Sequence, residues 1–577
     1  MKNNILLSVS DLAVEFRNET GWHEAIHGVS FSLERGKTLG IVGESGSGKS
    51  VSALSVLRLL PDGISRISEG KIVFCPSPVE TYDILSLPEK EMRKLRGKAI
   101  SMIFQEPMTS LNPVMRCGKQ VAEVLRLHEG LNASDAKKRT LALFEEVKLP
   151  RAEEMYQSYP HQISGGQKQR VMIAMAMACK PALLIADEPT TALDVTVQKT
   201  ILELLKDLQE RHGISILFIS HDLAVVAQLA HHVAVMHNGE VVEYGPAEKI
   251  FTNPSHPYTL GLMACRPPHG LRLKRLPTVA EFLDNPEKNT KIQDDSLRIS
   301  REERKEHLDS LFGQEPVMKV NQLNTWFTRK KEGYFKPADF LKAVDEVSFE
   351  IFPGETLGLV GESGCGKTSL GRTMLGLIQA RDGQVIYKGR DLMALKERQM
   401  RLMRKDLQII FQDPYSSLNP RRTVGDSIME PMTVHSLYGN KASRKKRVLV
   451  LLEKVGLEAN HYDRYPHEFS GGQRQRVCIA RALSVDPDFI ICDESVSALD
   501  ISVQAQVLNL LNELKRDFGF TYIFISHDLG VVKYMSDRIA VMKDGKIVEM
   551  GEADEVYFNP QTTYTQSLIK AIPKFSS

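Results

Sequence analysis

The fold is decided by a glycine-rich stretch, GESGSGKS at 43–50, which returns as GESGCGKT at 361–368. Each copy follows a short apolar run that ends in glycine, TLGIVG and TLGLVG. The pattern G-x-x-x-x-G-K-[ST] between a strand and a helix places successive backbone N–H groups around a phosphate at a helix N-terminus. The chain is therefore expected to bind nucleotide phosphates at two loops.

Four further motifs recur in the same order after each loop. They read IFQEP and IFQDP, ISGGQ and FSGGQ, LLIADE and FIICDE, and FISHD in both halves. Gln105 and Gln412 are 307 residues apart, and Asp187 and Asp493 are 306 apart. A duplication that keeps its register over this span indicates two copies of one ATP-using domain on a single polypeptide.

The division of the chain follows from this repeat. Residues 1–265 are expected to form the first ATPase domain and residues 316–577 the second. Short continuous apolar strands separated by helical stretches predict an α/β fold with a mostly parallel sheet and helices on both faces. Residues 266–315 are dense in charge, and we interpret them as a solvated linker with one short helix around 300–311. The acids of the linker match its bases, which disfavours a nucleic-acid-binding arm.

Composition narrows the class of protein. Of the 577 residues, 42% are hydrophobic and 25% are charged, and the formal net charge of +2 gives no reason to expect nucleic acid as a partner. No apolar run approaches the roughly 18 residues of a bilayer-spanning helix, and the apolar stretch near Met1 is too short for a signal peptide. Seven scattered cysteines without a C-x-x-C pair favour a reducing compartment. We expect a cytoplasmic protein that reaches a membrane only through a partner.

Each half carries the residue types of an ATP-hydrolysing site. The loop lysine should reach the β- and γ-phosphates, and the hydroxyl after it should bind Mg²⁺. These residues are Lys49 and Ser50 in the first half and Lys367 and Thr368 in the second. The aspartate at the end of each acidic strand is placed to hold Mg²⁺ through its waters, and the glutamate after it to polarise the attacking water. The alternative is that these acids only cap a strand.

Taken together, the motifs resemble those of the ABC ATPase family. The resemblance rests on the phosphate loop, the glutamine of FQ-[ED]-P, SGGQ, the strand that ends in Asp-Glu, ALD at 192–194 and 498–500, and SHD. It covers both halves and leaves out only the linker. It implies two tandem P-loop NTPase cassettes, each with a RecA-like, mostly parallel sheet core, a helical subdomain and an antiparallel β part.

The resemblance also implies ATP and Mg²⁺ as cofactors in two composite sites. Each SGGQ would open a helix that caps the γ-phosphate bound by the opposite cassette, so the first would complete the site of Lys367 and the second that of Lys49. The catalytic residues implied are Lys49, Glu188, His221, Lys367, Glu494 and His527. The Mg²⁺ residues implied are Ser50, Gln105, Asp187, Thr368, Gln412 and Asp493.

The ATP-binding residues follow from the same motifs. In the first half they are Phe16, Gly43, Glu44, Ser45, Gly46, Ser47, Gly48, Lys49, Ser50, Val51, Gln105, Ser164, Gly165, Gly166, Gln167 and Asp194. In the second half they are Phe327, Gly361, Glu362, Ser363, Gly364, Cys365, Gly366, Lys367, Thr368, Ser369, Gln412, Ser470, Gly471, Gly472, Gln473 and Asp500. Phe16 and Phe327 are expected to stack on adenine, with Trp22, Trp326 and Tyr334 as alternatives.

Two repeated segments narrow the resemblance. The first reads QEPMTSLNP at 105–113 and QDPYSSLNP at 412–420. The second reads NPSHPYTLGL at 253–262 and NPQTTYTQSL at 559–568. They are similar to the oligopeptide/dipeptide branch of ABC importers, in its form with both ATPases fused. The alternative for the first segment is a turn rich in Ser, Asn and Pro.

The branch implies partners and a location. They are two integral-membrane permease subunits, which would dock on the Ser-Leu-Asn-Pro segments, and an extracytoplasmic substrate-binding protein. The chain would lie at the cytoplasmic face of the bacterial inner membrane and energise uptake of a di- or oligopeptide, glutathione or a peptide antibiotic. The alternative function is a soluble twin-cassette ATPase acting on ribosomes.

Neither half lacks a catalytic element, so both sites are expected to be competent. Ser495-Val496-Ser497 replaces Pro189-Thr190-Thr191, a change that we interpret as neutral. Cys365 stands where the first half has Ser47, beside Lys367 at a helix N-terminus. That setting predicts a thiol of lowered pKa that an alkylating reagent modifies before the other cysteines, the alternative being a small packed residue.

Overall fold

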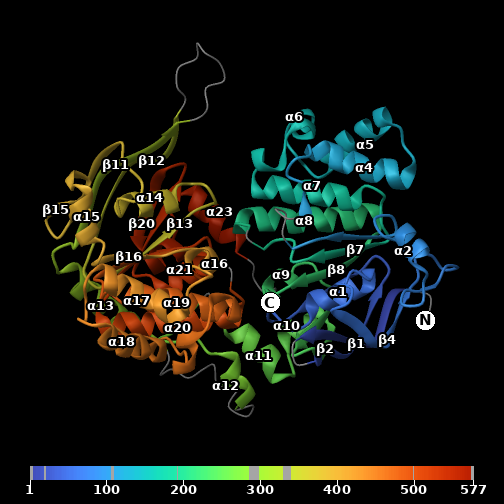
Figure 1. The fold of residues 1–577 in the computed structure, drawn as a ribbon. Coiled ribbons are helices and arrows are strands. Elements are labelled where there is room, and N and C mark those ends of the chain that lie inside the picture. Colours follow the sequence, from blue (N-terminus) through green and yellow to red (C-terminus); the bar gives the residue numbers. More distant parts are fainter. Residues whose placement is uncertain are drawn as a thin grey trace.

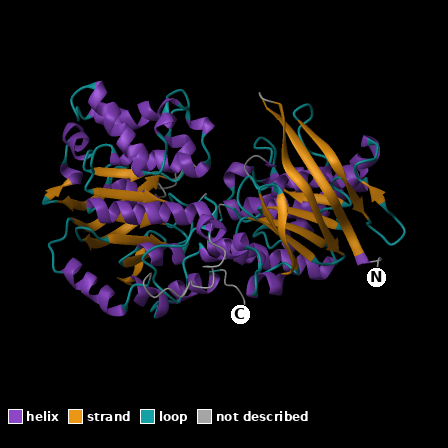
Figure 2. Cartoon of the chain, turned by 90° about the horizontal axis from the view of Figure 1, so that it is seen from below, coloured by secondary structure: helices purple, strands orange, loops and turns teal. Residues whose placement is uncertain are grey.

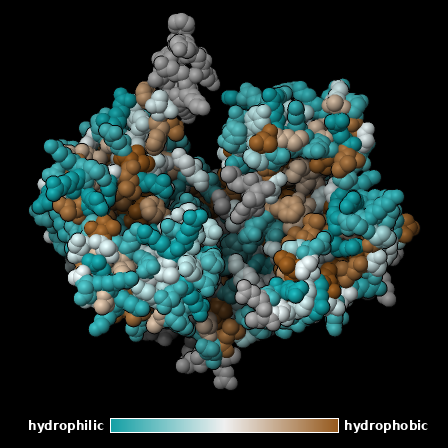
Figure 3. Space-filling model, in the orientation of Figure 1, coloured by the Kyte–Doolittle hydropathy of each residue, from teal (hydrophilic) through white to brown (hydrophobic). Residues whose placement is uncertain are grey.

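The computed structural model describes residues 4–18, 21–105, 110–191, 193–268, 270–284, 298–328, 340–497 and 499–572. Two halves of the same architecture lie side by side (Figure 1). The space-filling view shows a furrow between them (Figure 3). The sites of interest lie along this furrow, because the ends of the central strands of both halves face it.

Each half is built on a six-stranded sheet whose central strands are parallel. In the first half the order is β10-β9-β3-β8-β7-β6, and in the second it is β16-β17-β18-β13-β19-β20. The strands are β3 (Thr38–Val42), β6 (Ile100–Ile103), β7 (Leu183–Asp187), β8 (Ser215–Ser220), β9 (His232–His237), β10 (Glu240–Pro246), β13 (Thr356–Val360), β16 (Leu407–Ile410), β17 (Phe489–Asp493), β18 (Thr521–Ile525), β19 (Arg538–Lys543) and β20 (Lys546–Glu552). β10 and β20 run antiparallel to their neighbours. Every residue of β3, β7 and β8 is buried, as expected for short apolar strands covered on both faces.

A second, antiparallel sheet completes each half (Figure 2). The order is β2-β1-β4-β5 in the first half and β12-β11-β14-β15 in the second. The strands are β1 (Ile5–Asn18), β2 (Gly21–Glu34), β4 (Ser65–Phe74), β5 (Tyr82–Asp83), β11 (Met318–Thr328), β12 (Phe340–Ile351), β14 (Asp382–Tyr387) and β15 (Arg390–Asp391). Their apolar face packs on the inner face of the central sheet, where Leu7 and Ile72 join Leu39 and Ile185 in one core.

Helices cover the central sheet and form a separate lobe in each half. Those next to the sheet are α1 (Lys49–Leu57), α2 (Glu89–Leu95), α8 (Val195–His212), α9 (Leu223–Val226), α10 (Ala247–Thr252), α11 (Pro257–Ala264), α14 (Lys367–Met374), α15 (Glu397–Met403), α20 (Ile501–Phe518), α21 (Leu529–Met535), α22 (Ala553–Phe558) and α23 (Thr563–Ala571). The helical lobes comprise α4 (Cys117–Glu129), α5 (Ala133–Glu146), α6 (Ala152–Gln157), α7 (Gly165–Met177), α16 (Pro414–Ser417), α17 (Val424–Val434), α18 (Lys441–Lys454) and α19 (Gly471–Leu483). Within the described residues, none of these helices is long and apolar enough to cross a membrane. The α/β fold with a parallel core, a helical subdomain and an antiparallel part is confirmed.

The segment between the halves packs against both, because Val279 and Phe282 lie against Gly261 of the first half and other residues bond to the second half. It contains α12 (Val279–Asp284) and α13 (Arg301–Phe312), and α13 is the helix expected around 300–311. The backbone of Leu276 exchanges two hydrogen bonds of 2.8 Å with the side chain of Asn509 in α20. Arg304 of α13 pairs with the buried Asp537 at 2.7 Å. The described part of the linker is therefore less solvated than its composition predicts, because a few apolar and basic residues anchor it.

Candidate active site

Both phosphate loops are held in shape by their lysines. The Nζ of Lys49 donates to the carbonyls of Gly43 at 2.9 Å and Glu44 at 2.6 Å. In the second loop, Lys367 makes the same two bonds, at 2.8 and 3.0 Å. Gly48 adopts a φ of 99° at the start of α1, a left-handed conformation that favours glycine. The same lysine bonds therefore hold both loops in the same backbone conformation.

A hydroxyl and a carboxylate meet beside each loop. Ser50 Oγ donates to Asp187 Oδ1 at 3.0 Å, and Thr368 Oγ1 donates to Asp493 Oδ1 at 2.8 Å. Burial raises the pKa of Asp187 to about 6, although the Ser50 bond lowers it in part. Within the described part of the chain, Asp493 Oδ2 is buried without a hydrogen-bond partner, although Arg372 Nη2 lies 3.7 Å from it. A buried carboxylate beside a hydroxyl fits a Mg²⁺ ion, whose charge would keep the acid ionised.

Three side chains lie within hydrogen-bond distance of the glutamate of the first site. Glu188 Oε2 accepts hydrogen bonds from Gln105 Nε2 at 3.1 Å and Thr191 Oγ1 at 2.8 Å, and it lies 3.2 Å from His221 Nδ1. Burial alone would raise the pKa of Glu188, but the bond and charge of His221 outweigh it and hold the pKa at about 2. The carboxylate is therefore ionised and oriented at the end of β7.

The second site has a looser version of this arrangement. Gln412 Nε2 donates to Glu494 Oε2 at 2.8 Å, but His527 Nδ1 lies 3.8 Å from that oxygen. Ser497 donates to the backbone carbonyl of Glu494 at 2.9 Å, whereas Thr191 in the first site reaches the carboxylate. The exchange of Thr for Ser keeps the hydroxyl, and the two sites differ in which oxygen of the glutamate that hydroxyl bonds.

The SGGQ motifs open helices, as expected. Ser164 Oγ accepts from the backbone N–H of Gln167 at 3.3 Å, and the backbone N–H of Ser164 donates to Gln167 Oε1 at 2.9 Å. These two bonds cap α7. Ser470 and Gln473 cap α19 in the same way. No hydrogen bond joins either motif, with its Gly165, Gly166, Gly471 or Gly472, to the opposite phosphate loop among the residues that the structure describes. The helix N-termini are formed, but they are not brought into contact with the loops.

Of the two ALD aspartates, only Asp500 makes a hydrogen bond across the furrow within the described residues. Asp500 Oδ1 accepts a hydrogen bond from Ser45 Oγ of the first phosphate loop at 3.0 Å, and Ser502 bonds Glu44 beside it. The equivalent Asp194 instead caps its own helix through the N–H of Val197 at 2.9 Å. The preceding alanines, Ala192 and Ala498, lie outside the described residues. The first loop is therefore partly covered by the second half.

The aromatic residues proposed for adenine separate into two groups. Phe327 lines a cavity of about 370 Å³ with Gly364, Gly366 and Ser369 of the second loop. Phe16 lies on β1 opposite His23 and is half-buried against the core that also receives Val51 of α1. Arg66 covers the ring of Trp22, and Arg381 that of Trp326. Tyr334 lies outside the described residues. The geometry favours Phe327 over Trp326 in the second half.

Cys365 is not the exposed thiolate that its sequence position predicts. Its Sγ lies 3.9 Å from Lys367 Nζ, yet only 7% of the residue is exposed and it packs in the core of the second half. Burial raises the pKa of the Cys365 thiol, and the nearby ammonium offsets this only in part. The prediction of a lowered thiol pKa was wrong, because burial outweighs the effect of the ammonium, whereas preferential alkylation stays a prediction.

Sequence reasoning missed two tyrosines that hold the phosphate loops. Tyr258 of α11 accepts a hydrogen bond from the backbone N–H of Glu44 at 3.1 Å, and Tyr564 of α23 accepts one from Glu362 at 3.1 Å. Burial raises the pKa of Tyr564 to about 12, so the hydroxyl stays neutral. The signal was present in the repeated Tyr-Thr of HPYT and TTYT. The C-terminal motif of each half thus reaches its own nucleotide loop.

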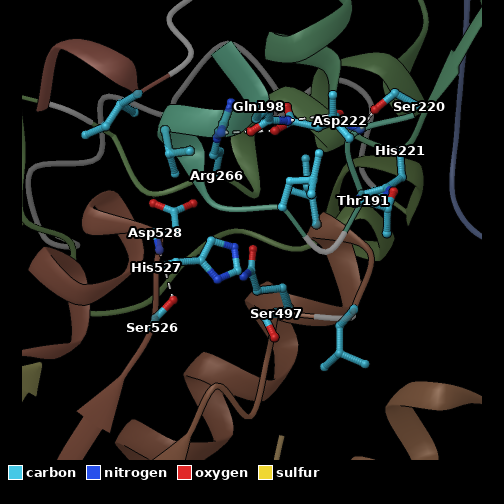
Figure 4. A pocket seen from close by; sticks show the side chains of 17 residues that line it. Thr191, Gln198, Ser220, His221, Asp222, Arg266, Ser497, Ser526, His527 and Asp528 are labelled. Carbon is cyan, nitrogen blue, oxygen red and sulfur yellow. Dashed lines mark hydrogen bonds and ion pairs between the residues drawn. The ribbon is translucent and has the colours of Figure 1, made fainter. Parts of the chain in front are cut away.

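The two sites approach each other at a cavity of about 100 Å³ between the halves. It is lined by both SHD loops and by the residues just after both acidic strands (Figure 4). His221 and His527 face it from opposite sides, each beside its own glutamate. The histidine loops of both halves therefore border one small cavity.

Comparison with known proteins agrees with this geometry. The family described as ABC transporter matches residues 26–191 and 344–497, which include both phosphate loops and both acidic strands. The chain belongs to the ABC transporter family. It is an ATPase of that family, and the matched ranges together span more than half of its length.

A second family and several curated relatives refine the position of this ABC ATPase. The family described as oligopeptide/dipeptide transporter, C-terminal region, matches 242–291 and 548–577. Relatives named glutathione import ATP-binding protein GsiA are 46% identical in Pectobacterium atrosepticum and 47% identical in Salmonella typhimurium and Escherichia coli O6:H1. In each comparison 98% of this chain and 89% of the relative are covered. The similarity thus includes the linker as well as both cassettes.

Proposed function

We propose that this ABC ATPase energises a bacterial importer for peptides, of the kind that takes up dipeptides, oligopeptides or glutathione. The observation that carries the proposal is the pair of C-terminal regions matched by the oligopeptide/dipeptide transporter family. Each region supplies the tyrosine that bonds to its own phosphate loop. Relatives named for glutathione import support the same substrate class.

Catalysis would use ATP and Mg²⁺ in two sites. Ser50 and Asp187 would hold the ion in the first site together with Gln105, and Thr368, Asp493 and Gln412 in the second. Glu188 and Glu494 would orient the attacking water, because each is ionised and fixed at the end of a buried strand. His221 and His527 would contact the γ-phosphate, with the lysines on the β- and γ-phosphates.

The two halves would close head to tail around two ATP molecules. The bond between Ser45 and Asp500 supports this pairing, since it joins the phosphate loop of one half to the ALD motif of the other. α19 lies across the furrow from α1, and α7 across from α14 (Figure 1). Closure along the furrow would bring each SGGQ helix N-terminus towards the opposite loop, where its N–H groups favour an anion.

The partners would be two permease subunits and an extracytoplasmic binding protein, at the cytoplasmic face of the inner membrane. In or just after the two Ser-Leu-Asn-Pro segments the chain presents an exposed apolar side chain: Val114 is 82% exposed and Tyr415 is 57% exposed. Leu111 and Leu418 of the same segments are 1% and 3% exposed, so they anchor the segment instead of docking a partner. The docking surface is therefore the residues around the buried leucines.

Reconstitution tests the proposal against action on ribosomes. The chain is combined in proteoliposomes with the two permeases encoded beside it and their binding protein, and ATPase activity is measured with glutathione, dipeptides and longer peptides. We expect one of these to raise hydrolysis and to be taken up with ATP. Stimulation by ribosomes, with none by any peptide-loaded binding protein, would reject import in favour of the alternative.

A further inference from the structure

Arg266 reaches from the end of the first cassette to the loop that carries His221 (Figure 4). It follows α11, and its Nη1 and Nη2 donate to the two carboxylate oxygens of Asp222 at 3.2 and 3.1 Å. Both side chains are mostly buried at the central cavity. A two-pronged bond between guanidinium and carboxylate fixes orientation as well as distance. Because Asp222 is the next residue after His221, the histidine is held with it.

The second cassette has no such bond. Ile572 occupies the place equivalent to Arg266, 306 residues further on, and a proline follows in both halves. Ile572 lines the same cavity and is buried, but it brings no charge. Among the residues that the structure describes, no basic side chain pairs with Asp528, whose carboxylate accepts from the N–H of Gly530 at 2.8 Å. The histidine loop of the second site therefore keeps the local bonds of Ser526 and Gly530 to Asp528 but lacks the bridge that Arg266 makes in the first.

The two halves also differ in the distance between the histidine and the glutamate. His221 lies 3.2 Å from Glu188, within hydrogen-bond distance, whereas His527 lies 3.8 Å from Glu494. The bridged loop is therefore the one whose histidine lies closer to its glutamate. Since a general base works through its orientation as well as its charge, the first site is better arranged for hydrolysis.

We propose that Arg266 is a positioning residue that makes the two ATP sites unequal. By fixing Asp222 it holds His221 against Glu188, so the first site hydrolyses ATP faster than the second. The inference rests on the roles proposed above for the histidines and glutamates, and it does not depend on peptide import or on the permeases.

Site-resolved trapping tests the proposal in the purified full chain. The protein hydrolyses 8-azido-ATP in the presence of orthovanadate, is illuminated, and is digested, and labelled peptides are assigned by mass spectrometry to either cassette. Arg266→Ile copies the residue of the second half. Arg266→Lys keeps the charge but cannot make the two-pronged bond, and Ile572→Arg places an arginine at the equivalent position of the second half. Arg301→Ile, which removes an exposed arginine of the linker, is the matched control.

In the wild type we expect more label in the first cassette, and in Arg266→Ile a fall of about threefold or more in the ratio of first to second. Arg266→Lys should be intermediate, Ile572→Arg should move label towards the second cassette, and Arg301→Ile should match the wild type. An unchanged ratio in Arg266→Ile, with ATP binding and thermal stability intact, overturns the proposal. If that variant does not fold, an unchanged ratio in Ile572→Arg overturns it instead. Loss of hydrolysis in the wild type would contradict the ATPase assignment and not this inference.

Discussion

At the scale of single residues, the phosphate loops depend on side chains far away in the sequence. Tyr258 and Tyr564 each hold the backbone N–H that follows the first glycine of a loop, at 3.1 Å in both halves. The two halves differ in many surface residues but agree in this bond. Such agreement between two copies in one chain indicates a constraint on the loop itself.

Removing both tyrosine hydroxyls should weaken ATP binding. In the double variant Tyr258→Phe and Tyr564→Phe, the N–H groups of Glu44 and Glu362 lose their buried acceptor, which costs about 1–3 kcal/mol per site. We expect a higher Kd for ATP measured by equilibrium binding, with kcat changed less than KM. Tyr244→Phe, which removes a hydroxyl bonded only near the surface, is the control. Equal ATP affinity in the double variant and the wild type would show that the bond is dispensable.

The catalytic glutamates give a second residue-scale prediction. Glu188→Gln together with Glu494→Gln keeps an oxygen that can accept the hydrogen bonds of the side chain but removes the charge that we propose polarises water. Hydrolysis should fall by about 100-fold or more, while ATP binding remains and the closed pair accumulates. Phosphate release and nucleotide binding are measured on the same sample. Hydrolysis at the wild-type rate would reject these residues as the water-polarising groups.

At the scale of elements, the sequence predicts a helix, strand or loop correctly where its shape depends on residues close together in the chain. The loops, the acidic strands and the caps of α7 and α19 follow from short segments whose residue order dictates their backbone. The burial of Cys365 and Leu111 was not predictable, because side-chain direction depends on packing against distant strands and helices. The bond between Arg266 and Asp222 was not predictable either, because neither sequence segment indicates that it contacts the other.

The segment around Val114 should carry contact with the permease. Val114→Asp places a charge on a side chain that is 82% exposed, so folding and basal hydrolysis should be unchanged. Association with the permease should weaken by about tenfold or more, because a charge in the apolar centre of an interface is costly. Val79→Asp, at another exposed valine (92%), is the control. Normal binding and uptake by Val114→Asp would contradict the docking surface.

The docking of α13 gives a prediction of pH dependence. Burial of Asp537 would raise its pKa, but Lys515, His307 and Arg304 together hold the pKa well below its usual value. The folded-state pKa therefore lies below the unfolded value of about 3.9. The stability that the carboxylate contributes is present above that value and is lost as the pH falls through the folded-state pKa.

Asp537→Asn should consequently destabilise the second half at neutral pH and much less in acid. Removing the carboxylate that Arg304 and Lys515 share, while Arg304 keeps Glu552, costs on the order of 3 kcal/mol above about pH 5. The two tryptophans, Trp22 and Trp326, lie one in each half, so urea unfolding followed by fluorescence in a Trp22→Phe background reports on the second half. A loss of unfolding free energy on Asp537→Asn that stays constant down to about pH 3, below the unfolded-state pKa, would reject the charged pairing.

At the scale of the whole molecule, the two halves repeat one design but are not in the same state. The second half covers the first phosphate loop through Asp500, while Asp194 turns back to cap its own helix. The linker packs on both halves within the described residues, with Val279 against Gly261 of the first half and with Leu276 and Arg304 bonded to the second half. A duplicated chain can hold such differences because one continuous polypeptide allows each half to diverge separately.

Cross-linking between the halves tests the head-to-tail pairing and its asymmetry together. A short bismaleimide is applied to the variant Ser45→Cys with Asp500→Cys and to the equivalent variant Ser363→Cys with Asp194→Cys. Without nucleotide, the first pair should react faster, because Ser45 and Asp500 are already in contact at 3.0 Å. With ATP in the background of both Glu→Gln changes, the second pair should react as fast as the first, since closure brings both loops against the opposite half. Equal rates without nucleotide would contradict the asymmetry, and failure of both pairs with ATP would contradict the head-to-tail pairing.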